Sequence, residues 1–446
     1  MVKTIVFLTP HYLNFASVTA LKTLHDTCRT VLIADRADVL LDKIESHMSV
    51  IIRADGDPHR NIRTLLDHEQ CRLVVSDELR KLGGNSSAIR IFCQEECHVE
   101  LAALLREEFG IEGDTLEVVS NFRDKVRMKG AVNSKGIRIP AFAKLDQARL
   151  ARDPEGYYTE LCAAFGLPLD QARLARDPEG YYTELCAAFG LPLVIKPVNS
   201  AGSFEVSIVH DKAGFLTTRD QITASLFHFE YEVDEFINGQ MFQCDSFVVD
   251  GEVRYCGLLE LGCTNFDFVQ GKPLSVIPVL DPALKSRLEA FNRDVIAALN
   301  FRNGSTHHEL FVDHASGEPI FLEIAARVPG GIGVPYHEKN SDINLIDANL
   351  YLTAGSEKLN AIQPHSKNNV VSALLPLRKG KISQLNNPPI SSEFVIEWKV
   401  SPGMVVDSKS LADNAGILTF YNLDPKSLRA DFDALQGYQP TQVEAL

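Results

Sequence analysis

Two glutamates and an arginine that could bind a metal and a phosphate lie in residues 306–331, THHELFVDHASGEPIFLEIAARVPGG. The segment predicts two β-strands around the turn HASGE, which is rich in turn-forming residues. A turn centred on Ser316 would set Glu309 opposite Glu323, and alternation along the strand would place Arg327 on the same face. Facing carboxylates are unfavourable unless a positive charge lies between them. Because Mg²⁺ takes oxygen ligands and commonly joins one or two carboxylates to substrate phosphates, the spacing predicts a magnesium and phosphate site.

Salt bridges offer a second interpretation of the same hairpin. Arg327 would then neutralise Glu309 and Glu323 on a solvated surface, and no metal would be needed. Phosphate-binding residues elsewhere in the chain favour the first interpretation over this one.

Several separated segments carry the residue types that bind phosphate. Lys125 lies at the start of a helical stretch in NFRDKVRMK, and Lys196 lies in LVIKPVNSAGSFEVSIV, which predicts a strand, a small-residue turn and a second strand. Gly202, with Ser200 and Ser203, predicts a loop whose backbone N–H groups could close over phosphate. Taken singly, a lysine on a strand is more often an edge residue whose ammonium reaches solvent. The chain has no GxxxxGK[ST] segment, so a P-loop is excluded.

An adenine site is indicated by YEVDEFINGQ, residues 231–240, which predicts a strand followed by a turn. Backbone groups of Glu235, Phe236 and Ile237 could face the base, with the Phe236 and Ile237 side chains packed on its ring. The alternative is an ordinary strand end without a ligand.

Glycine-rich and loop segments near these residues are expected to bind or cover the substrate. In GGIGVP, Pro335 is expected to prevent the helix that a dinucleotide-binding loop needs. Gly330 and Gly331 are therefore expected to line a substrate carboxylate through their backbone N–H groups. The loops at 199–204 and 264–273 are candidate lids that would keep water from the reaction.

The elements that position these residues begin with an N-terminal lobe. Apolar runs predict strands at 4–8, 30–34, 49–53, 72–76 and 89–93, and helical stretches at 17–24, 37–44 and 59–66 lie between the first four. Such alternation predicts a parallel α/β sheet. The loop after the first strand reads TPHYLNF rather than GxGxxG, so the lobe is expected to be a scaffold without a dinucleotide site.

An exact repeat interrupts the middle of the chain. LDQARLARDPEGYYTELCAAFGLP occurs at 145–168 and again, identically, at 169–192. Solenoid repeats diverge and recur at least three times, so a perfect double copy indicates a recent tandem duplication or an assembly error. One copy suffices to connect a strand ending near Lys144 with a strand at 193–197, and we assign the repeat no chemistry.

Composition narrows the classes of function. The 446 residues, 45% apolar and 23% charged, are typical of a globular protein with several lobes. The net charge of −15 argues against a nucleic-acid partner, and no apolar run approaches the length of a membrane span. Nine scattered cysteines favour reduced thiols and a cytoplasmic location. Cys93, Cys97 and His98 lack a second pair at zinc-site spacing, so we expect no zinc there.

The order of these segments resembles that of the ATP-grasp superfamily, and within it the carboxylate–amine ligases, in particular the L-amino-acid (dipeptide) ligases. The resemblance covers residues 95–360 and rests on NFRDKVRMK, LVIKPVNSAGS, VDEFINGQ, HHELFV and FLEIAARVPGG. It implies an α/β protein with the ATP-grasp fold. The expected domains are an N-terminal pre-ATP-grasp domain (1–115), an ATP-grasp domain (116–365) that contains the repeat, and a C-terminal lobe (366–446).

The resemblance also implies roles for individual residues. Lys125 and Lys196 would bind the phosphates of ATP, and Glu309 and Glu323 would carry Mg²⁺, with Mn²⁺ left open as a substitute. Arg327 would hold the substrate carboxylate and its acyl phosphate and would act with Lys196 in catalysis. The remaining expected contacts are Ser200, Gly202, Ser203, Glu235, Phe236 and Ile237 for ATP, and Gly330 and Gly331 for the substrate. The usual ExNxR reads EIAAR here, so the asparagine that often binds metal is missing.

The expected reaction is ATP-dependent amide formation through an acyl phosphate, with release of ADP and phosphate. The expected partners are small amino acids or other small carboxylates and amines, and a homodimer is left open. The sequence names no residue that would deprotonate the amine. The main alternative is a phosphotransferase with the same ATP site. A nucleotide-binding regulator without turnover and a biotin-type carboxylase are less favoured, because the charged residues are intact and no biotin signature is present.

Overall fold

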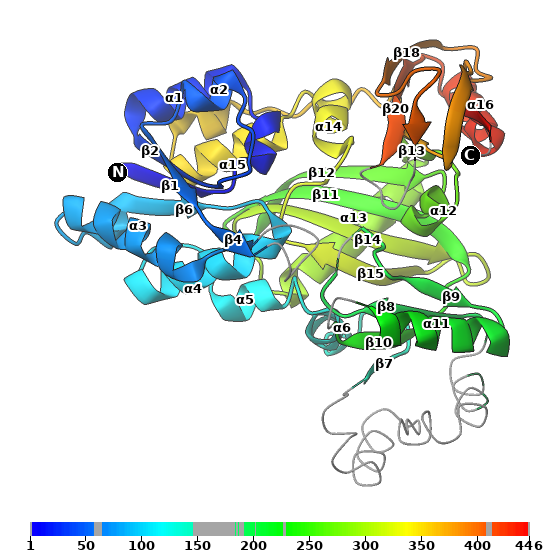
Figure 1. Cartoon of the computed structure of the whole chain (residues 1–446), viewed down its shortest axis with the longest axis horizontal. Coiled ribbons are helices and arrows are strands. Elements are labelled where there is room, and N and C mark those ends of the chain that lie inside the picture. Colours follow the sequence, from blue (N-terminus) through cyan, green and yellow to red (C-terminus); the bar gives the residue numbers. More distant parts are fainter. Residues whose placement is uncertain are drawn as a thin grey trace. The chain divides into compact units, whose positions relative to one another are not determined.

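The computed structural model describes residues 2–57, 65–145, 183, 186, 191–200, 202–225, 229–406 and 413–444 (Figure 1). The chain forms two compact units. Unit 1 consists of Met1–Arg123, Met241–Glu309 and Glu323–Leu446, and unit 2 consists of Asp124–Gln240 and Leu310–Leu322. The predicted repeat at 145–192 lies almost entirely outside the described residues.

Unit 1 begins with the parallel sheet that the sequence predicts. Its strand order is β3-β2-β1-β6, formed by β1 (Thr4–Leu8), β2 (Arg29–Asp35), β3 (Val50–Ala54) and β6 (Ile89–Phe92). All three pairings are parallel. Alternate residues of β1 enter different cores: Phe7 packs with α1 (Val18–Thr27) and α15 (Leu345–Ala354), whereas Val6 packs with α3 (His68–Lys81) and α4 (Val99–Phe109). Helices therefore cover both faces, which explains why successive residues of β1, rather than alternate ones, are apolar and buried.

Three predictions for this lobe need correction. Residues 72–76 are not a strand but part of α3, which Asp67 caps by accepting a hydrogen bond from the Gln70 N–H. The buried residues of α3 are Cys71, Val75 and Glu78, a helical spacing, while Leu73 is exposed. The helix predicted at 37–44 is reduced to α2 (Asp42–Glu45).

The helix predicted at 59–66 is wrong at its last two residues. Residues 59–64 lie outside the described part of the chain, but Leu65–Leu66 form β5, which pairs antiparallel with β4 (Gly56–Asp57).

An eight-stranded sheet has the order β15-β14-β11-β12-β13-β16-β20-β18. Its strands are β11 (Gly239–Val249), β12 (Glu252–Leu261), β13 (Leu274–Pro278), β14 (Gly304–Asp313), β15 (Pro319–Ala325), β16 (Val370–Pro376), β18 (Glu393–Trp398) and β20 (Asn414–Tyr421). The hairpin predicted within 306–331 is thus present as β14 and β15. Asp313 closes its turn by accepting hydrogen bonds from the backbone N–H groups of Ala315 and Ser316.

Unit 2 contains a smaller antiparallel sheet with the order β7-β10-β8-β9. Its strands are β7 (Phe142–Leu145), β8 (Leu193–Pro197), β9 (Ser207–Val209) and β10 (Tyr231–Glu235), and its helices include α6 (Lys125–Asn133) and α11 (Lys212–Ala224). The strands predicted from LVIKP and YEVDE are therefore confirmed. The register sets Glu232 of β10 directly opposite Lys196 of β8.

The remaining elements complete unit 1. The helices are α5 (Leu116–Ser120), α12 (Asn265–Val269), α13 (Pro282–Ala298), α14 (Gly333–Ser341) and α16 (Pro425–Ala434). Short 3₁₀ turns are His11–Phe15, Ser86–Ala88, Glu96–His98, Glu357–Ala361 and Leu435–Gly437. A third sheet joins β19 (Val405–Val406), β17 (Gly380–Leu385) and β21 (Thr441–Glu444). No helix in the described ranges has the length and apolarity needed to cross a membrane.

Two predicted loops contain helices. The expectation that Pro335 prevents a helix is wrong, because α14 begins at Gly333 and Pro335 lies in its first turn. A proline is tolerated there, since the N–H groups of the first turn have no partner within the helix. The predicted loop at 264–273 contains α12, which begins with a capping box between Thr264 and Asp267.

Candidate functional site

The lysine predicted to bind ATP phosphate lies in a buried cluster of charges in unit 2. Lys196 Nζ is 2.8 Å from Asp234 Oδ2 and 3.7 Å from Glu232 Oε1. Lys129 Nζ, from α6, is 3.0 Å from Glu232 Oε1 and 2.5 Å from Asp234 Oδ1. All four side chains are buried. We call Lys129, Lys196, Glu232 and Asp234 the lysine–carboxylate cluster.

The two carboxylates of this cluster differ in their acid–base behaviour. Burial raises the pKa of Glu232, and the neighbouring charge of Asp234 raises it further. Burial alone would also raise the pKa of Asp234, but Lys129 and Lys196 hold it below its ordinary value. The sequence analysis missed Lys129. Its spacing of four residues from Lys125 on one helix was the available signal, because such residues share a helix face.

Lys125 contacts the start of the predicted glycine loop. Lys125 begins α6, and its Nζ donates a hydrogen bond of 2.7 Å to the backbone carbonyl of Ser200. Gly202 and Ser203 follow with φ of +66° and +56°, the left-handed conformation that glycine adopts at no steric cost. Phosphate binding by this loop and its role as a lid stay predictions.

The residues expected to face adenine lie where β10 ends. Both carboxylate oxygens of Glu235 lie 2.9 Å from Arg138 Nη2, and one of them accepts a hydrogen bond from the Ala141 N–H. Ile237 is buried and Phe236 is partly buried. The strand agrees with the prediction, and residues 236–238 connect it to β11. The adenine contact itself stays a prediction.

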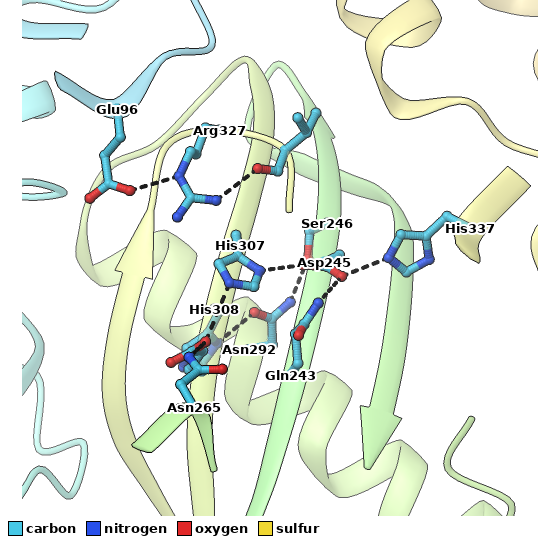
Figure 2. Close-up of polar contacts among 12 residues, drawn as sticks. Glu96, Gln243, Asp245, Ser246, Asn265, Asn292, His307, His308, Arg327 and His337 are labelled. Atoms are coloured by element: carbon cyan, nitrogen blue, oxygen red, sulfur yellow. Dashed lines mark hydrogen bonds and ion pairs between the residues drawn. The ribbon is translucent and has the colours of Figure 1, made fainter. Parts of the chain in front are cut away.

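Glu309 lies on β14 in unit 1, where two side chains donate to one of its oxygens. Asn265 Nδ2 is 3.1 Å from Glu309 Oε1, and His307 Nε2 is 3.4 Å from the same oxygen. His307 Nδ1 is 2.8 Å from Asp245 Oδ1 on β11 (Figure 2). Glu309 and Asp245 are buried. The predicted metal ligand is thus connected to a second acid through a histidine.

Asp245 is held by further groups from separate elements. His337 Nε2 of α14 lies 2.6 Å from Asp245 Oδ2, and Gln243 Nε2 donates to the same oxygen (Figure 2). We call Gln243, Asp245, His307, Glu309 and His337 the histidine–carboxylate network. The sequence analysis missed all of its members except Glu309.

Charge partners set the pKa values in this network. Burial alone would raise the pKa of Asp245, but hydrogen bonds from His307 and His337 hold it well below its ordinary value. Burial alone would lower the pKa of His307, but hydrogen bonds with Asp245 and Glu309 raise it to about 9. Burial lowers the pKa of the neighbouring His308 to about 3, and the charge of His307 contributes to this lowering.

Glu323 lies partly buried on β15, the strand hydrogen-bonded to β14. Adjacent strands therefore carry the two predicted metal ligands, but their facing arrangement stays a prediction. Within the residues that the structure describes, no group of three or more His, Cys, Asp or Glu side chains could hold a metal ion. A pair of carboxylates still suits Mg²⁺, which binds few protein ligands and fills its shell with water and substrate phosphate.

Arg327 lies two residues beyond the end of β15, so strand alternation does not determine its direction as expected. Its Nε is 2.7 Å from Glu96 Oε2, and its Nη1 donates 2.9 Å to the Val328 carbonyl (Figure 2). In the described part of the chain its hydrogen bonds use Nε and Nη1. Gly330 and Gly331 follow in the turn that leads into α14.

The cysteine cluster has structural contacts. Cys97 Sγ lies 3.1 Å from His98 Nδ1, and His98 Nε2 accepts a hydrogen bond from the Leu66 N–H. Cys93 Sγ donates to the Glu95 carbonyl. The eight cysteines in the described residues are all free thiols.

Residues 189–336, which include Lys196, Glu309, Glu323 and Arg327, match the ATP-grasp domain family. Dapdiamide A synthase of Enterobacter agglomerans is 32% identical over 147 residues, which cover 31% of this chain and 34% of that protein. The L-arginine-specific L-amino acid ligase of Bacillus subtilis is 23% identical over 321 residues, 68% of each chain. The match to the first relative thus spans 34% of its length.

Solved structures show the same fold. The L-amino acid ligase of Bacillus licheniformis superimposes over 99% of both chains with a TM-score of 0.65 and 14% sequence identity. The ATP-grasp fold and the resemblance to L-amino-acid ligases, both predicted from the sequence, are therefore confirmed. ATP-grasp domains use ATP, and the relatives named above are a synthase and ligases.

Proposed function

We propose that this protein is an ATP-dependent carboxylate–amine ligase that joins two amino acids through an amide bond. The ATP-grasp match over residues 189–336 carries the proposal, because it contains one predicted phosphate lysine, both predicted metal ligands and Arg327. The full-length likeness to an L-amino acid ligase fold supports it. Amino acids are proposed as substrates because two of the relatives are named L-amino acid ligases.

The nucleotide would be held mainly by unit 2. Lys125 and Lys196 would contact its phosphates, the backbone of Ser200, Gly202 and Ser203 would close over them, and residues 235–237 would bind adenine. Mg²⁺ would be held by Glu309 and Glu323, and it would neutralise charge on the phosphates. Lys196 is already desolvated, so its attraction to phosphate would exceed that of a surface lysine.

Arg327 would orient the carboxylate that is activated. A guanidinium can bind a carboxylate through two parallel N–H groups, and the partly buried pair with Glu96 would fix the position of this one. The carboxylate oxygen would form a bond to the γ-phosphorus while the bond from that phosphorus to ADP breaks. The amine nitrogen of the second amino acid would then bond to the acyl carbon, and phosphate would leave with the bridging oxygen as the amine loses a proton.

Release of ADP in the presence of single amino acids and of pairs tests this proposal. We expect ADP release that depends on an amine acceptor, with one amide product per ADP by mass analysis. A stable phosphorylated product that forms without any amine would instead identify a phosphotransferase. An enzyme with Glu323→Gln serves as the background control.

A further inference from the structure

One oxygen of Glu309 is occupied by protein donors, which points to a use for the other. Asn265 Nδ2 and His307 Nε2 both approach Oε1, at 3.1 and 3.4 Å. In the described ranges, the hydrogen bonds and ion pairs of this side chain all involve Oε1. A carboxylate held through one oxygen presents the second in a fixed direction, as a metal ligand requires.

His307 is fixed in turn by Asp245, so that its ring cannot rotate freely. Its two nitrogens face two different carboxylates, Asp245 at 2.8 Å and Glu309 at 3.4 Å (Figure 2). The three side chains come from β11 and β14, neighbouring strands of the eight-stranded sheet. The ring is therefore a rigid link between Asp245 and Glu309.

Asp245 is held from the far side by His337, whose other ring nitrogen is 2.9 Å from the Tyr255 hydroxyl. Gly257 makes room for this contact, since a Cβ there would lie 2.3 Å from His337 Cε1. Asp245 and His337 have no measurable exposure, so this anchor lies in the protein interior.

We propose that Asp245 and His307 are positioning residues that fix the direction of Glu309 for a divalent cation. This inference rests on the proposed function, because it assumes that Glu309 binds the metal. In this proposal Asp245 and His307 act through Glu309, which would bind the metal. Carboxylate–histidine pairs orient metal ligands in the same way in other metal sites.

The next residue on the same strand provides a matched control. His308 is as buried as Asp245, but its Nδ1 is 2.8 Å from Asn292 Oδ1 (Figure 2). Its ring stacks on Phe291. A substitution of His308 would thus disturb the same strand without breaking the link to Glu309.

Binding of Mn²⁺ in the presence of ADP, measured by electron paramagnetic resonance, tests the proposal without relying on turnover. Asp245→Asn and His307→Gln should each weaken Mn²⁺ binding by about 10–100-fold. The double variant should bind no more weakly than either single one, because both changes break one chain of contacts. The affinity for ADP without metal should stay unchanged, and His308→Asn should bind Mn²⁺ like the wild type.

Wild-type Mn²⁺ affinity in Asp245→Asn, or an equal loss in His308→Asn, would overturn the proposal. Thermal unfolding reports whether each variant is folded, and the less buried His307→Gln decides the matter if Asp245→Asn does not fold. If the wild type binds Mn²⁺ with ADP but forms no amide, the ligase proposal fails while this one stands. If the wild type binds no Mn²⁺, the metal site and this inference both fail.

Discussion

The lysine–carboxylate cluster of unit 2 and the histidine–carboxylate network of unit 1 differ in the groups that neutralise their buried carboxylates. In the cluster, Glu232 and Asp234 each lie within 4 Å of two ammonium groups. In the network, the contacts of Glu309 within the described residues are with an amide and a histidine, and both approach the same oxygen. The cluster supplies its own ammonium groups, whereas our proposal assigns the other oxygen of Glu309 to a bound cation.

This contrast suggests different tasks for the two groups. A charge-balanced cluster needs no ligand for its stability, because two ammonium groups face two carboxylates. An acidic group with an open oxygen gains most from a bound metal. We therefore expect substitutions in the network to act on catalysis, and substitutions in the cluster to act on both stability and catalysis.

The largest effect is expected for Glu323→Gln. Loss of a metal-binding carboxylate should reduce ADP formation by at least about 10²–10³-fold, the scale seen when one group that stabilises transition-state charge is removed. The melting temperature should be unchanged or higher, because repulsion between facing carboxylates is relieved. Near-normal turnover in the steady-state assay would mean that Glu323 is not a metal ligand.

Lys196→Ala should lower kcat or raise the KM for ATP by about 10²–10³-fold, as for other lost charge clamps on a phosphoryl group. It should also destabilise the fold, because Glu232 and Asp234 would share a single ammonium. Adding Asp234→Asn restores the charge balance, so the double variant should regain stability without regaining activity. Recovery of both together would show that Lys196 acts only through folding.

Lys129→Met should act mainly on stability. Removing one partner of a buried ion pair typically costs about 3–5 kcal/mol, because the remaining charge is uncompensated. Urea denaturation of Lys129→Met and of Lys129→Met with Glu232→Gln measures this cost and its expected rescue. The account of the cluster would be wrong if the single variant were as stable as the wild type.

The smallest effect is a pH dependence of opposite sign for two neighbouring histidines. The pKa of His308 falls from its unfolded value near 6.5 to about 3, so its contribution to stability is present above pH 6.5 and is lost as the pH falls. The pKa of His307 rises to about 9, so its contribution is present below pH 6.5 and is lost as the pH rises to 9.

The free energy of unfolding of the metal-free protein, measured as a function of pH, tests both signs. Each titration has a limiting slope of about 1.4 kcal/mol per pH unit in the free energy of unfolding. His308→Asn should flatten the acid limb of the stability curve, and His307→Gln should flatten the alkaline limb. Flattening of the same limb by both substitutions would contradict the assigned environments.

The sequence predicted well those features that local pattern encodes. The strands that became β1, β2, β3 and β6 are continuous apolar runs, and the hairpin of β14 and β15 has a turn of strong turn formers. The strand predicted at 72–76 was wrong because a short apolar run fits a helix as well as a strand. Asp67, which caps α3, is the local signal for the helix. The prediction that Pro335 prevents a helix was wrong because proline is disfavoured in helix interiors but is tolerated in the first turn.

The histidine–carboxylate network could not be predicted in the same way. Asp245, His307 and His337 lie on β11, β14 and α14, and only the order of strands in the sheet brings the first two together. Local periodicity contains no information on which strands pair. Glu309 could be predicted because the local hairpin pattern pairs it with Glu323 and because it matches a motif of the family that the chain resembles.

An oxygen-labelling experiment tests the central claim of amide formation through an acyl phosphate most directly. The wild type would be given ATP and an amino-acid pair that supports ADP release, with ¹⁸O in both carboxylate oxygens of the acyl donor. We predict one ¹⁸O atom in the released phosphate and one in the amide product for each ADP formed. Released phosphate without ¹⁸O, alongside normal ADP release, would contradict the account.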